Sequence, residues 1–159
     1  MKNLYLFLLL LCSYNSWAQD APIVNPRFLV MDTSLSMAPA FNAEILKAVP
    51  GFRLLGSEKL PGQIIAYTFV DGRDGSIRLD YKYSSESGKQ LINYQSITAD
   101  LEVIIPIFNA LFRTKMAATI DNAQQIGGSC IYKQHAYQYA LQADDYKPGY
   151  WTLSFIRTE

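Results

Sequence analysis

The sequence predicts an α+β fold in which an antiparallel sheet packs against helices in a single domain. Residues 63–83 hold two runs rich in β-branched and aromatic side chains, separated by a cluster of turn residues. After Thr98 the spacing of apolar residues changes from two to about 3.6, which is typical of an amphipathic helix. From residue 131 the period of two returns. Strands and helices that come in blocks, without regular alternation, favour α+β over a parallel α/β sheet.

The second run of the central segment is the clearest strand in the chain. Its apolar residues alternate with charged ones, so one face lies on a core and the other in water: Ile77, Leu79, Tyr81 and Tyr83 against Arg78, Asp80 and Lys82. The first run, residues 63–70, is apolar on both faces and is expected to be more central. Glycines and aspartates in 71–75 tolerate positive φ, so the two runs are predicted to close as an antiparallel hairpin.

Other elements follow from local patterns. We expect a short strand at 28–31, a helix that begins at Pro39 and ends before Pro50, an edge strand at 52–60, a polar turn at 84–88 and a strand at 90–97. The long helix is predicted over 98–115, with Thr98 as N-cap and a bend at Pro106. Its core face is expected to hold Leu101, Ile104, Ile105, Phe108, Leu111 and Phe112. The pattern leaves open whether this helix, or a second short one, continues to Ile126.

The C-terminal segment is predicted to form a second antiparallel hairpin around a turn at 144–149. Ile131, Tyr137, Tyr139 and Leu141 share one parity before the turn, and Trp151, Leu153 and Phe155 share another after it.

Composition limits the class of protein. The chain has 159 residues, of which 50% are hydrophobic and 18% charged, which suits one domain with a sizeable core. Its 14 basic and 14 acidic residues balance and form no basic block, so nucleic acid is not expected as a partner.

Residues 1–18 have the pattern of a secretory signal peptide. A short basic start precedes the apolar run 4–11, and Ser16 and Ala18 are the small residues expected before a cleavage site. We therefore divide the chain into a signal peptide (1–18), an extended lead-in (19–27) and one α+β domain (28–159). The signal style is bacterial, and no later run is long enough to span a membrane. The mature protein is expected to be exported, to the periplasm or beyond the cell.

The two cysteines fit this interpretation. Cys12 follows Leu11, which is larger than the small residue usual before a lipoprotein cysteine, so loss of Cys12 with the signal is favoured over a lipid anchor. Cys130 is then the only cysteine left, so it is either a buried thiol or paired between chains.

Residues 41–115 carry a resemblance to a known family. The segments VPGFRLLGSEK, PGQIIAYTFVDG, SIRLDYKY, GKQLINYQS and DLEVIIPIFNALF follow one another as a short helix, a meander of strands and a closing helix. This layout resembles the PsbP-like group, which includes a photosystem subunit and DcrB-type periplasmic proteins. The resemblance implies the fold and a binding role, and it implies no catalytic residue.

Three local motifs suggest other chemistry. The turn at Asp32, Ser34 and Ser36 is similar to the D-x-S-x-S metal motif of von Willebrand factor A domains, and Thr98 is spaced like that family's threonine ligand. Leu35 replaces the family's glycine, and no later strand ends in the expected aspartate, so a capping turn is favoured. Residues 71–75 lack the ligand spacing of a calcium loop. His135, the only histidine, has no second ligand beside it for zinc.

These observations predict a small, exported, non-catalytic binding or interaction protein without a cofactor. Its partner is an unknown protein or small ligand, and tyrosines with one histidine are the candidate contacts: Tyr132, His135, Tyr146 and Tyr150. Two alternatives remain: a metal-dependent adhesion module built on the Asp32 turn, and an enzyme whose site the sequence does not reveal.

The signal peptide gives the first testable prediction. When the chain is expressed in a bacterial host, cleavage is expected near Ala18, because small residues precede that position. Mass spectrometry of the mature N-terminus measures this. Retention of residues 4–11, or a lipid on Cys12, would contradict the prediction.

Overall fold

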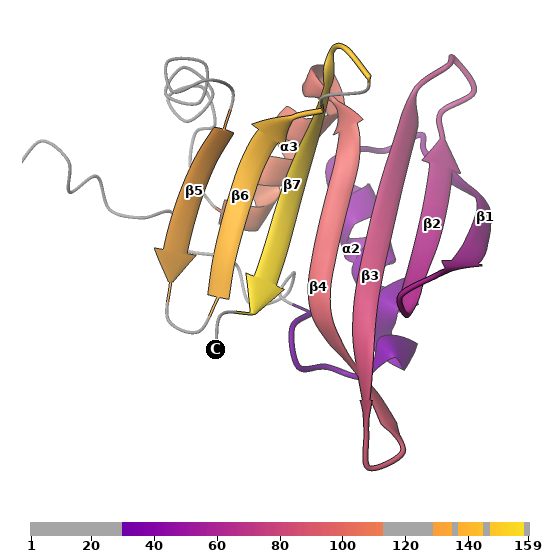
Figure 1. The fold of residues 1–159 in the computed structure, drawn as a ribbon. Helices are drawn as coiled ribbons and strands as arrows, with labels where there is room; N and C mark the ends of the chain where they lie inside the picture. Colours follow the sequence, from indigo (N-terminus) through magenta and orange to yellow (C-terminus); the bar gives the residue numbers. More distant parts are fainter. Residues whose placement is uncertain (1–29, 113–128, 135–136, 145–146, 158–159) are drawn as a thin grey trace, which may run out of the picture.

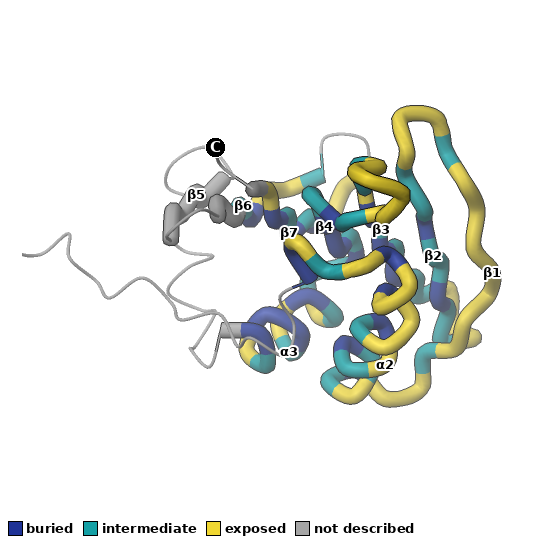
Figure 2. The backbone as a smooth tube through the Cα atoms, turned by 90° about the horizontal axis from the view of Figure 1, so that it is seen from below, coloured by how far each residue is buried: buried dark blue, intermediate teal, exposed yellow. Residues whose placement is uncertain are grey.

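The computed structural model describes residues 30–112, 129–134, 137–144 and 147–157, and it confirms the α+β class. The strands form one antiparallel sheet of seven in the order β1-β2-β3-β4-β7-β6-β5. Helices α2 and α3 lie on the same face of this sheet, as Figures 1 and 2 show from two directions. The elements are η2 (Leu35–Met37), α2 (Ala38–Ala48), β1 (Arg53–Leu60), β2 (Ile64–Val70), β3 (Ser76–Glu86), β4 (Lys89–Asp100), α3 (Leu101–Phe112), β5 (Ser129–Gln134), β6 (Tyr137–Ala143) and β7 (Tyr150–Arg157).

The predicted hairpin is present as β2 and β3, but the expectation that the first run is the more central strand is wrong, because β2 lies next to the edge strand β1. The alternation in β3 is confirmed, because Ile77, Leu79 and Tyr81 are buried while Lys82 is exposed. The next turn is shorter than expected, since β3 continues to Glu86 and only two residues connect it to β4. These are Ser87 and Gly88, both at positive φ (51° and 78°), as in a type I′ hairpin turn.

The N-terminal helix is confirmed as α2. Pro39 stands at its start, and Ile45 and Val49 are buried against the sheet. The prediction of a strand just before this helix is wrong at Val30 and Met31, which lie in coil and in a turn. Both are nevertheless core residues, so their apolar character reflects burial and not a strand.

The long helix α3 begins at Leu101, and Thr98 is not its N-cap. Strand β4 continues to Asp100, whose Oδ1 accepts a hydrogen bond from the backbone N–H of Val103 at 3.0 Å. The carboxylate therefore takes the capping role at the positive end of the helix. Thr98 lies in β4, where a β-branched side chain suits the pleated surface. Pro106 lies inside α3 as expected.

The buried face of α3 is centred differently from the prediction. Ile104, Ile107, Phe108 and Leu111 are buried, at the i, i+3, i+4, i+7 spacing of one helical face. Ile105 was expected in the core but is 36% exposed, because it lies about 100° around the helix from Ile104. Residues 113–128, which include the continuation to Ile126, lie outside the described residues.

The C-terminal segment holds three strands where one hairpin was predicted. Strands β6 and β7 form the expected hairpin, and β5 adds a further strand that pairs with β6. Ile131 therefore lies in β5 and Tyr137 in β6. In the pairing of these two strands, Gln134 is the partner of Tyr137. Strand β7 pairs with β4, which joins the C-terminal strands to the N-terminal meander.

Strand β1 is an edge strand, as predicted. It pairs only with β2, and a bulge between Leu54 and Gly56 shifts its register. Leu54 and Leu55 are 56% and 69% exposed beside this bulge. A bulge and charged side chains such as Glu58 and Lys59 are usual features of a protected sheet edge.

One polar cluster lies inside the core, between α2 and the sheet. The Tyr81 hydroxyl donates to Asn42 Oδ1 at 2.6 Å, and Gln95 Nε2 donates to the Tyr81 oxygen at 3.5 Å. All three residues are buried. Burial raises the pKa of Tyr81 well above its ordinary value of 10.0, because the charged phenolate would lose its water.

The position of α3 on the sheet gives the second prediction. Phe108→Ala should destabilise the protein by about 3–5 kcal/mol, because it leaves a cavity under a fully buried ring. Ile105→Ala on the same helix is the matched control and should cost about 1 kcal/mol or less, because that side chain already contacts water. Urea melts of both variants measure the difference. Equal losses would mean that the buried face is misassigned.

The core polar cluster gives the third prediction. Tyr81→Phe should cost about 1–3 kcal/mol at neutral pH, because Asn42 then lacks its donor. The folded-state pKa of Tyr81 is raised, so its contribution is complete below about pH 10 and is lost as pH rises further. The difference in unfolding free energy between wild type and Tyr81→Phe should therefore become smaller when urea melts are repeated at alkaline pH.

Tyr83→Phe is the control for that series, since Tyr83 is a half-buried tyrosine on the same strand. It should lower the free energy of unfolding at neutral pH by less than Tyr81→Phe does. A gap that stays constant up to about pH 12 would argue against the role given to the Tyr81 hydroxyl.

Candidate functional site

The face of the sheet opposite the helices is the candidate site. Figure 1 views the molecule from this side, with α2 and α3 behind the strands. Among the described residues, no helix lies over this face (Figures 1 and 2). The register of the strands places its residues in rows that run across the sheet.

One row crosses the middle of this open face, and we call it the central row. Its members are neighbours in the pairing from β6 to β1, and most have short side chains: Ala140, Ser154, Ser96, Asp80, Ala66 and Glu58. The flanking rows have longer side chains. Gln142, Thr152, Thr98, Arg78 and Thr68 lie on one side, and Ile156, Tyr94, Lys82 and Ile64 lie on the other.

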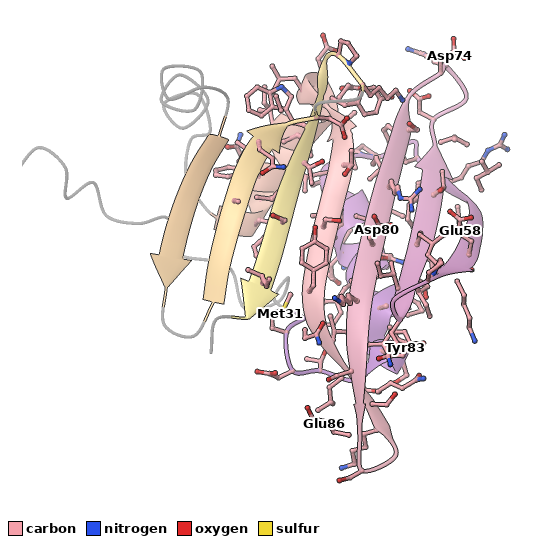
Figure 3. The ribbon with its side chains drawn as sticks, viewed as in Figure 1. Met31, Glu58, Asp74, Asp80, Tyr83 and Glu86 are labelled. Atoms are coloured by element: carbon pink, nitrogen blue, oxygen red, sulfur yellow. The ribbon has the colours of Figure 1, made fainter. Side chains whose placement is uncertain are left out.

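Asp80 is the charged centre of this row. Figure 3 shows it on β3, with Glu58 farther toward the β1 edge. Arg78 Nε donates to both carboxylate oxygens of Asp80, at 2.9 and 3.2 Å, and Arg78 also lies 3.7 Å from Glu58 Oε1. Burial raises the pKa of Asp80, although the Arg78 cation and its hydrogen bond act in the opposite direction. The result is a partly desolvated carboxylate held in one orientation.

Ser96 stands beside Asp80 on β4 and is only 3% exposed. Within the described part of the chain, its hydroxyl makes no hydrogen bond. A buried hydroxyl without a partner is unfavourable, because it has lost water and gained nothing in return. Such a group in a native structure calls for a specific explanation, and a bound molecule is one.

Two threonines continue the polar surface next to Ser96. Thr98 Oγ1 and Thr152 Oγ1 are 2.9 Å apart and hydrogen-bonded across β4 and β7. This pair gives the face a fixed arrangement of hydroxyl groups: both can still accept a hydrogen bond from a molecule above the sheet, and one can still donate.

Tyr150 is the one predicted contact residue whose side chain is described. Its hydroxyl is 3.2 Å from Ser76 Oγ, and Lys147 Nζ lies 3.4 Å from the centroid of its ring. The hydrogen bond from Lys147 lowers the pKa of Tyr150, and the bond with Ser76 acts in the same direction. These contacts join the β6–β7 turn to the start of β3 at one end of the open face.

The other predicted contacts are not brought into this site by the described structure. His135 and Tyr146 lie outside the described residues. Tyr132 is in β5, paired in register with Tyr139, and its side chain is likewise not described. Cys130 is also in β5, opposite Leu141.

The proposed metal turn is separated from its fourth residue. Asp32 and Thr33 hydrogen-bond through their backbones to Ile92 near the start of β4, at 2.8 and 2.9 Å. Thr98 lies six residues farther along that strand, on the order of 20 Å away. Ser34 Oγ and Ser36 Oγ bond to each other at 2.9 Å, and Ser34 caps the short helix η2. The arrangement fits the capping turn and does not assemble the four residues.

Two further observations concern metals and membranes. No cluster of three or more His, Cys, Asp or Glu side chains suited to a metal occurs within the described ranges. The loop at 71–75 is a turn in which Asp71 Oδ1 accepts from the backbone N–H of Arg73 and Gly75, at 2.7 and 3.0 Å. In the part of the chain that the structure describes, no helix has the length and apolar character to cross a membrane.

An open groove of about 720 Å³ lies between the Ser34–Ser36 turn and the β3–β4 hairpin. Lys89 and Gln90 line it together with the two serines, and all four residues are exposed. Ordering such side chains around a ligand costs entropy. The groove is therefore less prepared for binding than the central row, where Arg78 already holds Asp80 in one orientation.

Comparisons with known proteins find no relative of this chain. No protein-family model, no curated protein and no solved structure matches this chain.

Proposed function

We propose that this chain is a small exported binding protein without catalytic activity, and that it binds its ligand or partner on the open face of its sheet. The observation that carries the proposal is the Ser96 hydroxyl, which is buried on that face and has no hydrogen-bond partner among the described residues. Asp80 lies beside it in register, already oriented by Arg78. Groups held in place before binding lose little entropy when a ligand arrives.

The chemistry of the central row supports binding more than catalysis. A general base needs access to a proton on a substrate and a nucleophile or water in reach. The Asp80 carboxylate is instead held by Arg78 through both oxygens, and each oxygen keeps a lone pair that can accept a further hydrogen bond. Hydroxyls and a neutralised carboxylate can hold and orient a molecule by hydrogen bonds.

Export is the second part of the proposal, and it is supported by the sequence of residues 1–18. A charged start, an apolar run and small residues before Ala18 are typical of a cleaved signal. The PsbP-like layout of residues 41–115 agrees with an exported binding role.

The fourth prediction tests binding through this face. The mature protein is screened by thermal unfolding against separate sets of short peptides, oligosaccharides and amphiphiles. At least one class should raise the Tm, by on the order of 5–10 °C at a hundredfold excess over Kd. Ser154→Arg should abolish this shift, because the new side chain fills the central row.

The control places the same arginine on the other side of the molecule. Ala43 is an exposed residue of α2, in the helix layer, so Ala43→Arg should keep the full ligand-induced shift. A shift that survives in Ser154→Arg, or the absence of any stabilising class, would overturn the proposed function.

A further inference from the structure

The hydrogen-bonding groups of the central row and its neighbours differ in kind. The Asp80 carboxylate only accepts, the Arg78 guanidinium only donates, and the hydroxyls of Ser96 and Ser154 do both. Asp80 and Arg78 lie next to each other on one face of β3, joined at 2.9 Å. A molecule with adjacent hydroxyl groups matches this set, since one hydroxyl can donate to the carboxylate while its neighbour accepts from the guanidinium.

The charges around the row favour a neutral ligand. Arg78 and Lys82 carry positive charge on this part of the face, and Asp80 and Glu58 carry negative charge. The two signs are therefore balanced, and Arg78 contacts both carboxylates. Such a surface has no excess field to attract a polyanion or a polycation.

An apolar strip lies directly beside the polar row. Tyr94 and Ile156 are paired across β4 and β7, and Ile156 is 46% exposed. A sugar ring has hydroxyls at its edge and C–H groups on its face, and the C–H face packs well on an aromatic side chain. A protein partner would be expected to meet larger anchoring side chains at the centre of the site than serine and alanine.

The geometry points to a neutral oligosaccharide as the ligand of the open face. Its chain lies along the central row, across the strands. Asp80 and Arg78 hold a pair of neighbouring hydroxyls, Ser96 gains its missing hydrogen bond, and Tyr94 packs against a ring. Strands are spaced about 4.8 Å apart, so successive sugar units meet successive strands. This inference rests on the proposed binding role and specifies its ligand.

The test uses the mature chain and three neutral probes: maltoheptaose, cellohexaose and hexa-N-acetylchitohexaose. Isothermal titration calorimetry should detect at least one of them with millimolar affinity or better. The affinity should not fall when the salt concentration is raised, because a neutral ligand gains nothing from the field of the protein. Asp80→Asn should weaken binding about tenfold or more, because the charged acceptor is replaced by a neutral amide, whose hydrogen bonds are weaker.

Ser96→Ala separates recognition from folding. Its hydroxyl has no partner in the described structure, so its removal should leave the Tm unchanged or higher while it weakens binding several-fold. Ser85→Ala changes an exposed serine near the β3–β4 turn, away from the row, and should leave affinity and Tm unchanged.

The outcomes are distinct. Failure of all three oligosaccharides, or equal affinity in wild type, Asp80→Asn and Ser96→Ala, overturns the inference. If another class of molecule then binds to the wild type and not to Ser154→Arg, the proposed binding role of the face is supported and only the oligosaccharide assignment is overturned. If nothing binds through the face, both fall.

Discussion

The arrangement of this protein depends on burying one face of a single sheet. Helices α2 and α3 lie on the same side, so each strand of the central sheet must present apolar residues to that side and polar residues to the other. Strand β3 shows this most clearly, with Leu79 and Tyr81 buried and Asp80 between them on the open face. A slip of one residue in register would exchange the two faces, so the core fixes the position of the polar side chains on the open face.

The polar cluster inside the core makes this placement more specific. Hydrophobic contact alone is not directional, but the bond from Tyr81 to Asn42 requires α2 to lie at one height along β3. Tyr81 and Asp80 are consecutive residues on opposite faces. The contact that positions the helix therefore also fixes the strand that carries the charged centre of the open face.

Sequence patterns gave the fold class, the central hairpin, the edge strand β1 and helix α2, because each has a strong local period or a clear terminating residue. They failed where the signal was not local. Strands β5 and β6 were merged because no glycine or proline lies in residues 135–136 between them. Ile107 and Ile105 could not be told apart before the packing direction of α3 was known. Ser96 was missed because the burial of a serine depends on neighbours from three strands.

The pairing of β4 with β7 has a consequence for the order of folding. Thr98 and Thr152 meet although they are 54 residues apart, whereas β1 to β4 pair with their neighbours in sequence. Local pairings close small loops and form quickly, while a distant pairing must first overcome a larger loss of chain entropy. The N-terminal meander is therefore expected to form first and to act as the template onto which β7 docks. Since Ser96 and Asp80 belong to the early half and Ser154 to the late half, the central row is complete only after the last strands have joined. A nascent or partly folded chain therefore presents only part of this polar surface.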